Sequence, residues 1–259
     1  MASRFFNRQH LIQPCQVVLR RFGYEIHKLP HRLPPVRRPV GVMPCFLKDV
    51  AARGFKPQSI LDVGANKGDW SKMAMAVFPT AALLMIEPQR EMVPHLQQFC
   101  RNFPTARYIE AGAGAMPGEL TLTLWDDLEG SSLLPAENSE LTKDKIRRSI
   151  PIVTIDSLYD DKTNLPDLVK LDIQGFELEA LKGAQKLFGR TELFILEISL
   201  YEFLPKQPLV SDVVAFMAQR GYETYDLPGF MRRPLDGALG QMDIAFALRD
   251  GFLRKSRDW

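Results

Sequence analysis

Short apolar runs alternate with amphipathic segments along most of this chain. The runs predict strands, and the segments between them predict helices at 46–53, 69–78, 90–102, 177–187 and 211–220. Seven strands are expected in the main sheet, at 59–63, 82–86, 106–110, 168–173, 193–198, 222–225 and 242–248. Strands that alternate with helices of about 10–15 residues indicate βαβ units and a mainly parallel sheet. The pattern therefore predicts an α/β fold, a doubly wound three-layer sandwich.

The middle and the ends of the chain depart from this alternation. Residues 119–125 alternate Leu with Thr, which is typical of a half-exposed strand, whereas 131–148 are polar and irregular before an extended stretch at 150–154. Five prolines between Pro30 and Pro44 indicate a stiff, extended linker. We expect a basic, Pro-rich arm with a short helix over 1–44, a main domain over 45–250 and a basic tail over 251–259.

Charge is balanced overall but not along the chain. The net charge is +2, yet residues 1–40 hold eight basic side chains against one acid, a net +7 that leaves −5 for the rest. A solvated leader explains this arm, and contact with an anionic membrane surface is the alternative. Binding of nucleic acid is not expected. The Arg-rich, acid-poor start also fits an organellar transit peptide.

Cysteine usage and hydropathy favour a cytoplasmic location. Cys15, Cys45 and Cys100 are too widely spaced for a zinc site or a disulfide framework. No apolar run reaches the ~18 residues needed to span a bilayer, and the start lacks the apolar core of a secretory signal.

A glycine loop directly after the first strand carries the strongest chemical signal. Asp62 ends the strand, and Gly64, Ala65, Asn66 and Gly68 follow it. Glycines let a backbone turn sharply and lie against a ligand, and ligands of open α/β sheets bind at the carboxyl ends of strands. The G-x-x-x-G spacing differs from the G-x-G-x-x-G of dinucleotide sites. The Asp62 carboxylate would repel a pyrophosphate but suit a cationic ligand with ammonium and sulfonium groups.

Two further segments fit a nucleoside ligand at the same edge. Glu87 ends the second strand before Pro88, where a carboxylate can accept both ribose hydroxyls of an adenosine. Gly112 and Ala113 follow the third strand, and such small residues leave room for a flat adenine ring. A simple turn explains Gly112 and Ala113 equally well.

A second group of polar residues follows the fourth strand. Asp172 ends that strand, which neighbours the first in a doubly wound sheet, and Lys170 lies on the same side. The pair would position a substrate hydroxyl or tune a proton acceptor. Glu197 ends the next strand and is a third candidate. Glu177 opens a helix, where it is either a substrate residue or a cap favoured by the helix dipole.

The proton acceptor is expected to be a carboxylate because histidine is scarce. His10, His27 and His31 precede the sheet, and His95 falls on a predicted surface helix. Asp172 is favoured over Glu197 as the base. The two acids could instead hold a divalent cation, but no ligand set is complete in the sequence, so metal is not favoured. Ser131 and Ser132, in the irregular insert, either line the substrate entrance or belong to a plain polar loop.

Taken together, these motifs resemble the FkbM-type methyltransferase family over roughly residues 55–248. The similar segments are Asp62–Gly68, Glu87-Pro88, Ser131-Ser132, Ile155–Leu158, Lys170–Glu177, Leu181–Ala184, Leu196-Glu197 and Gln241–Asp243. The resemblance implies a class I methyltransferase (Rossmann-like) sheet of seven strands with an antiparallel last strand. It also implies S-adenosylmethionine as cofactor and O-methylation of a sugar, glycan or secondary metabolite.

The resemblance distributes roles among the candidate residues. It assigns the cofactor to Asp62, Gly64, Asn66, Gly68 and Glu87, with Ala65, Pro88, Gly112 and Ala113 beside them. Lys170, Asp172, Glu177 and Glu197 would form the second cluster. Relatives often carry an acid where this chain has Gln174, so a substrate role for Gln174 departs from the family pattern.

Two other functions stay open. A protein or nucleic-acid methyltransferase is supported only by the basic arm, and the N/D-P-P-Y/F signature of aromatic N-methylation is absent. A catalytically silent module would keep the cofactor fold without turnover. The loop spacing disfavours a nicotinamide oxidoreductase. The acceptor and the oligomeric state do not follow from the sequence.

Overall fold

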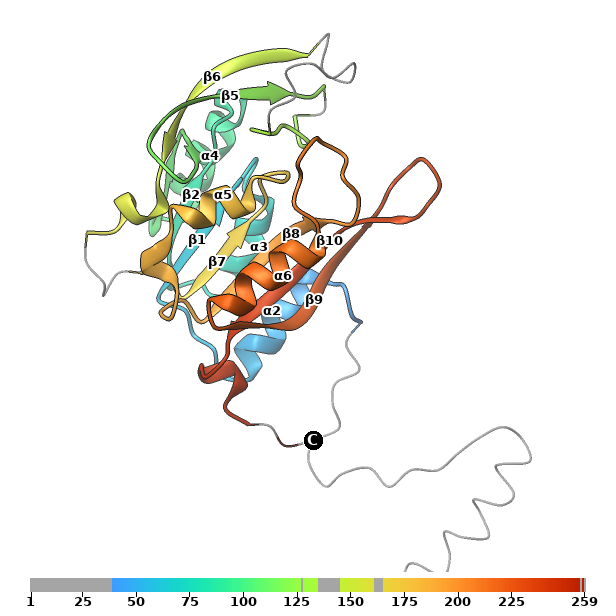
Figure 1. Ribbon diagram of the computed structural model, residues 1–259. Coiled ribbons are helices and arrows are strands. Elements are labelled where there is room, and N and C mark those ends of the chain that lie inside the picture. Colours follow the sequence, from blue (N-terminus) through green and yellow to red (C-terminus); the bar gives the residue numbers. More distant parts are fainter. Residues whose placement is uncertain (1–38, 127, 135–144, 161–164, 257, 259) are drawn as a thin grey trace, which may run out of the picture. The chain divides into compact units, whose positions relative to one another are not determined.

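The computed structural model describes residues 39–126, 128–134, 145–160, 165–256 and 258 (Figure 1). The predicted basic arm lies outside this part of the chain up to residue 38, together with His10, His27, His31 and Cys15. Within the described residues, no helix combines the length and apolar character needed to cross a membrane. The cytoplasmic location stays a prediction.

A seven-stranded sheet forms the centre of the fold, in the order β3-β2-β1-β7-β8-β10-β9. The strands are β1 (Ser59–Val63), β2 (Ala82–Ile86), β3 (Ala106–Ile109), β7 (Leu168–Leu171), β8 (Leu193–Ser199), β9 (Tyr222–Arg232) and β10 (Leu239–Leu248). Neighbouring strands from β3 to β8 pair in parallel, and β10 is antiparallel to both β8 and β9. This confirms the doubly wound sheet and its antiparallel last strand.

Helices cover both faces of the sheet and complete three layers (Figure 1). Apolar residues of α2 (Met43–Ala52), α3 (Asp69–Val77) and α4 (Val93–Asn102) pack on one face, against Ile60, Leu83 and Ile195. Those of α5 (Glu177–Lys182) and α6 (Val210–Gln219) pack on the other, against Leu61, Leu171 and Phe194. The strands are therefore apolar on both sides, as expected of a covered parallel sheet.

The irregular middle of the chain forms a second, three-stranded sheet. β4 (Gly112–Ala113), β5 (Gly118–Leu124) and β6 (Ile146–Val153) pair in the order β4-β6-β5. β6 begins within the segment expected to be irregular, because it pairs antiparallel with all of β5. Residues 135–144 of that segment lie outside the described residues.

Several element bounds differ from the sequence prediction for packing reasons. The predicted helix 177–187 breaks at Gly183, where a Cβ would lie 2.1 Å from the Gly114 carbonyl oxygen, and a 3₁₀ turn follows at Gln185–Leu187. β9 continues past residue 225 because it pairs with β10 as far as Arg232.

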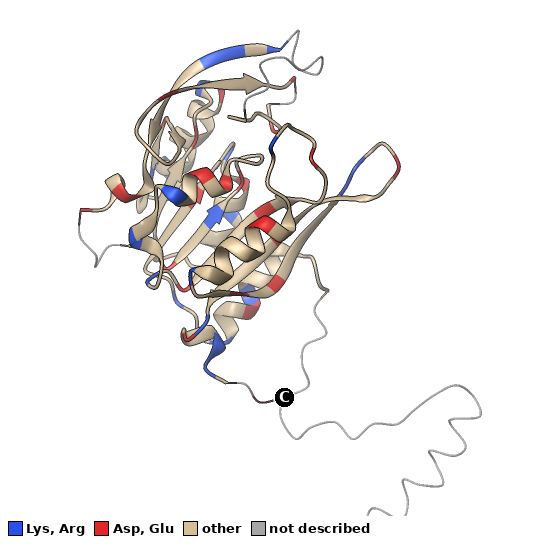
Figure 2. Ribbon diagram, in the orientation of Figure 1, with Lys and Arg blue, Asp and Glu red and all other residues tan. Residues whose placement is uncertain are grey.

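The predicted division into domains stays a prediction, and both of its boundaries lie among the described residues. The one after residue 44 falls inside α2, whose Phe46 and Leu47 are buried in the core. The tail begins with a 3₁₀ turn, η6 (Phe252–Arg254), where the backbone N–H groups of Phe252 and Leu253 donate to Glu192. In the view of Figure 2, acidic and basic positions are interspersed over the described helices.

Candidate active site

A cavity of about 250 Å³ opens at the carboxyl ends of β1, β2 and β7. Its walls bring together Gly64, Ala65 and Asn66 of the β1–α3 loop, Glu87 and Pro88 after β2, and Gly112 and Ala113 of β4. Ser131, Asp172, Gln174 and Glu197 line the same cavity. Most residues singled out in the sequence therefore share one space, although they come from six separate segments.

The glycine loop lies directly against the end of β7. Gly64 has φ +83°, and a Cβ there would lie 1.9 Å from the backbone oxygen of Asp172. Its N–H donates to the Ile86 oxygen at 2.8 Å, which ties the loop to β2 as well. Only glycine meets both demands, a left-handed backbone and no side chain. Gly68 has φ +81° and closes the turn by donating to the Ala65 oxygen at 2.7 Å.

Glu87 links the glycine loop to the segment after β2. One carboxylate oxygen accepts the Asn66 N–H at 2.8 Å, and the other accepts the Gln89 N–H at 2.9 Å. Burial raises the pKa of Glu87, and these two hydrogen bonds oppose that effect. Each oxygen has a further lone pair, so Glu87 can still accept hydrogen bonds from the hydroxyl groups of a ligand in the cavity.

Asp62 does not lie where the sequence argument placed it. Its side chain is only 1% exposed, is absent from the cavity walls and accepts a hydrogen bond from the Ser71 hydroxyl at 2.6 Å. Burial raises the pKa of Asp62 to about 7. The expected direct contact with a cationic ligand is therefore wrong for this conformation: Asp62 faces the α2–α3 side of the sheet beside Ile60, beneath the loop.

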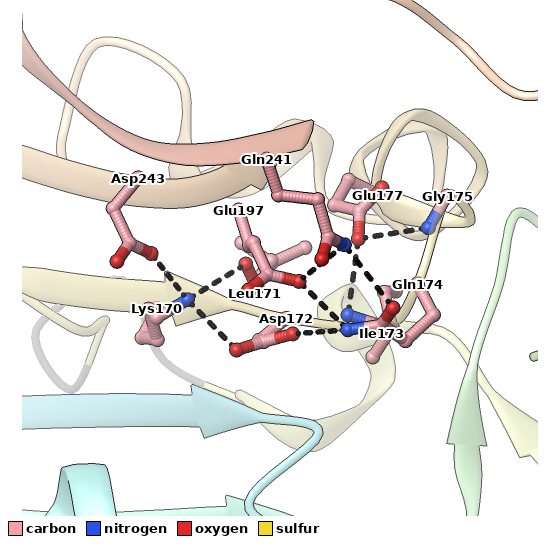
Figure 3. Close-up of polar contacts among 10 residues, drawn as sticks. All are labelled: Lys170, Leu171, Asp172, Ile173, Gln174, Gly175, Glu177, Glu197, Gln241 and Asp243. Carbon is pink, nitrogen blue, oxygen red and sulfur yellow. Dashed lines mark hydrogen bonds and ion pairs between the residues drawn. The ribbon is translucent and has the colours of Figure 1, made fainter. Parts of the chain in front are cut away.

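Lys170 is the centre of a buried charge cluster formed with Asp172, Glu197 and Asp243 (Figure 3). The Lys170 ammonium is 3.3 Å from an Asp172 oxygen and 3.0 Å from an Asp243 oxygen. The side chain of Lys170 is 3% exposed, whereas that of Asp172 is 33% exposed and lines the cavity. Lys170 therefore does not line the cavity but contacts Asp172, and the Asp172 carboxylate faces the cavity.

The two cavity carboxylates differ in protonation. Burial would raise the pKa of Asp172, but the Lys170 ammonium and neighbouring hydrogen-bond donors bring it below its usual range. Burial, followed by the negative charge of Asp172, raises the pKa of Glu197 to about 9. Burial also disfavours the charged form of Lys170, yet Asp172 and Asp243 raise its pKa overall. Because the two pKa values shift in opposite directions, Asp172 is the more readily ionised of the two carboxylates.

Two amides complete this wall of the cavity (Figure 3). The Gln174 amide nitrogen donates to Asp172 at 3.0 Å and to Glu197 at 2.7 Å. The Gln241 amide nitrogen donates to Glu197 at 3.1 Å and to the Gln174 oxygen at 3.3 Å. Gln174 has φ +52°, a left-handed backbone that is uncommon outside glycine. Strain of this kind gathers at functional sites.

Gln241 and Asp243 were not assigned roles in the sequence argument. Both lie near the start of β10 at alternate positions, which places them on one face of that strand. Asp243 pairs directly with Glu197 in the register of β10 and β8. Two polar residues at i and i+2 in an otherwise apolar strand were the available signal.

Two predicted substrate residues serve the loops instead. Glu177 is 3% exposed, and one of its oxygens accepts the N–H groups of Ile173 and Gly175 at 3.0 and 3.2 Å. Burial raises the pKa of Glu177 to about 7. Ser132 is 2% exposed and donates to the Gln174 backbone oxygen at 2.8 Å. Neither lines the cavity, and a direct contact of either residue with substrate stays a prediction.

Ser131 differs from its neighbour, because it lines the cavity. Its hydroxyl lies 3.0 Å from the Leu128 backbone oxygen and 3.4 Å from the Gln89 side-chain oxygen. His95 is exposed on α4, as expected. Within the described ranges, no group of three or more His, Cys, Asp or Glu residues is arranged to hold a metal ion.

Comparison with known proteins identifies the family. A family model described as the methyltransferase FkbM domain matches residues 62–224. The chain belongs to this family. The match confirms the resemblance expected from the motifs and contains the glycine loop, Glu87, the Lys170–Glu177 segment and Glu197.

Individual relatives of this FkbM-domain protein are distant. Methyltransferase sdnD of Sordaria araneosa is 26% identical over 159 residues, which cover 49% of this chain and 60% of that protein. The crystal structure of methyltransferase FkbM from Methylobacillus flagellatus KT is 20% identical with a TM-score of 0.48, covering 72% of this chain and 43% of the other. Magnesium protoporphyrin IX methyltransferase (ChlM) from Synechocystis PCC 6803, solved with bound SAM, is 11% identical with a TM-score of 0.45, covering 95% and 99%. The chain thus spans less than two thirds of the first two.

Proposed function

We propose that this chain transfers a methyl group from S-adenosylmethionine to a hydroxyl oxygen of a sugar, glycan or secondary metabolite. One observation carries the proposal. A single cavity is lined both by the glycine loop with Glu87 and by the Asp172–Glu197 pair. A methyl donor and a hydroxyl acceptor need these two kinds of wall, because the reaction joins them in line.

The cavity walls fit a cationic adenosyl ligand. Gly64 allows the backbone to form the floor, Glu87 offers hydroxyl-accepting oxygens, and Ala111, Gly112 and Ala113 provide a smooth surface for a flat ring. Asp172 adds negative charge beside the loop, which suits a positively charged ligand and opposes a diphosphate. S-adenosylmethionine supplies an electrophilic methyl carbon when bound.

The chain's own residues then orient the acceptor and take its proton. The acceptor oxygen forms a bond to the methyl carbon as the carbon–sulfur bond breaks, and the hydroxyl proton passes to the Asp172 carboxylate. The Lys170 ammonium, 3.3 Å from Asp172, favours the ionised form of Asp172, whereas burial raises the pKa of Glu197. Asp172 therefore stays ahead of Glu197 as the base, since it is the carboxylate available to accept a proton at neutral pH.

Calorimetry with S-adenosylmethionine, S-adenosylhomocysteine and NAD tests the donor half. We expect binding of the first two and none of NAD. Glu87→Ala should abolish that binding, while Glu119→Ala, on exposed β5, should leave it unchanged. Binding of NAD alone would overturn the proposal.

Turnover assays with hydroxyl acceptors test the second half. Asp172→Asn should keep the affinity for S-adenosylhomocysteine within about threefold but lower turnover by about 10²–10⁴-fold, the usual contribution of a general base. Cofactor binding without turnover on any acceptor would instead indicate a silent binding module.

A further inference from the structure

Two smaller cavities adjoin the candidate active site through the wall formed by Gln174, Glu197 and Gln241. One, of about 220 Å³, is lined by Gln174 and Gln241 on one side and by Trp125, Phe203 and Leu204 among its other residues. The other, of about 200 Å³, shares Glu197 and Met231 with the candidate active site and Gln241 with the first small cavity. The side-chain amides of Gln174 and Gln241 therefore lie between the candidate active site and the two smaller cavities.

The first of these cavities, which we call the Phe203 cavity, has two chemically different walls. Trp125, Phe203 and Leu204 are apolar, and the Phe203 side chain is 38% exposed. Gln174 and Gln241 present amide groups that both donate and accept hydrogen bonds. A ring compound with C–H groups on its faces and hydroxyls on its rim complements such a pair of walls.

Phe203 is held at the mouth of this cavity by a buried glutamine. The Gln207 side-chain oxygen accepts the N–H groups of Phe203 and Leu204 at 3.1 and 3.2 Å, and its nitrogen donates to Ser199 at 2.7 Å. Gln207 is 7% exposed. The backbone that carries Phe203 is thus fixed before any ligand binds, which lowers the entropic cost of binding.

The charges around these cavities select against anions. The described residues that line the Phe203 cavity include no Lys, Arg, Asp or Glu, and the second small cavity adds only Glu197 and Asp243. Lys170 is buried and paired with Asp172 and Asp243. Arg233 lies over the Tyr201 ring and forms an ion pair with Asp236. Lys145 lies 5.4 Å from the centre of the Trp125 ring and forms an ion pair with Asp126. An acceptor bearing phosphate or carboxylate would therefore have to compete with an existing carboxylate partner at each of these cations.

We propose that the Phe203 cavity is the acceptor subsite and that it takes a neutral, polyhydroxylated ring such as an unphosphorylated glycoside. This inference rests on the proposed function and narrows its substrate class. Phe203 and Trp125 contact the ring faces. Gln241 determines specificity by binding a hydroxyl next to the one that is methylated.

Saturation-transfer NMR on the full chain loaded with S-adenosylhomocysteine tests the subsite. The probes are a panel of methyl pyranosides and the corresponding sugar phosphates, each at the same concentration. We expect signals from at least one neutral glycoside and none from its phosphate. Phe203→Ala should reduce the neutral signal at least about threefold, as expected when an aromatic wall is removed, whereas Phe252→Ala, an exposed ring outside the cavity, should not.

A variant that introduces a positive charge gives the second arm. Gln241→Arg should allow binding of a sugar phosphate, while Gln98→Arg on exposed α4 should not. Equal binding of phosphates by the unaltered chain, or no binding of any neutral glycoside to the loaded chain, overturns the inference. Failure of the proposed function is distinct, because the chain would then bind neither S-adenosylmethionine nor S-adenosylhomocysteine.

Discussion

Replacing Gly64 with alanine tests the link between the glycine loop and β7. The new Cβ would lie 1.9 Å from the Asp172 oxygen and 2.9 Å from the Ile173 side chain. Backbone atoms cannot give way as a flexible side chain does, so the loop and the β7 end must separate. Gly64→Ala should therefore affect both folding stability and cofactor binding.

Two terms set the expected magnitude. A left-handed backbone costs a residue with a Cβ roughly 1–2 kcal/mol. Insertion of a methyl group into a closed contact adds about 1–3 kcal/mol. Together they predict a loss of about 2–5 kcal/mol in the free energy of unfolding.

Gly221→Ala separates these terms. Gly221 has nearly the same backbone, φ +84°, but a Cβ there meets nothing within 4 Å. It should lose only the first term, about 1–2 kcal/mol, in urea denaturation. Calorimetry should show that Gly64→Ala also weakens binding of S-adenosylhomocysteine at least about tenfold, since small misplacements at a site are costly. Equal destabilisation by the two variants, with cofactor affinity intact in both, would refute the reasoning.

Three further substitutions test the buried charges by urea denaturation. The folded pKa of Asp62 is about 7 and its unfolded value is near 3.8, so the folded state holds an extra proton between them and wild-type stability falls as pH rises from about 4 to 7. Asp62→Asn should flatten this slope and be the more stable protein at pH 8; an unchanged slope would contradict it. Lys170→Met leaves Asp172 and Asp243 uncompensated and should lose about 3–5 kcal/mol at pH 7, partly regained at pH 4–5; equal loss at both pH values would argue against the ion pairs. Glu177→Ala should lose about 2–4 kcal/mol by leaving two N–H groups unpaired, whereas Glu177→Gln should lose less than half of that because its oxygen still accepts them.

The strand order and the position of the loop were accessible from the sequence because they follow from local patterns. Apolar runs followed by Gly64 and Gly68 mark a strand, a turn and a helix start, and a doubly wound sheet then brings β7 next to β1. The placement of Glu87 and Asp172 at one cavity followed from that order, since carboxyl ends of parallel strands share an edge.

The direction of individual side chains was less accessible. Asp62 lies on the same face of the sheet as its register partner Lys170, but it is buried beneath the glycine loop, where Ser71 in the first turn of α3 supplies its donor. Glu177 accepts from residues that precede it, a contact that depends on the fold of the 173–176 turn. Gln241 and Asp243 reach the site only because β10 inserts antiparallel between β8 and β9, which is a property of the whole sheet.

The antiparallel strand β10 contributes to the site from a part of the chain far from the residues that bind the proposed methyl donor. The donor half is built on β1 and β2 and their loops, whereas Gln241 and Asp243 come from the start of β10, directly after the hairpin that follows β9. Insertions or deletions at that hairpin would reshape the acceptor half without altering the register of the strands that carry the glycine loop. The architecture thus allows descendants of one ancestor to change acceptor while keeping the same methyl donor.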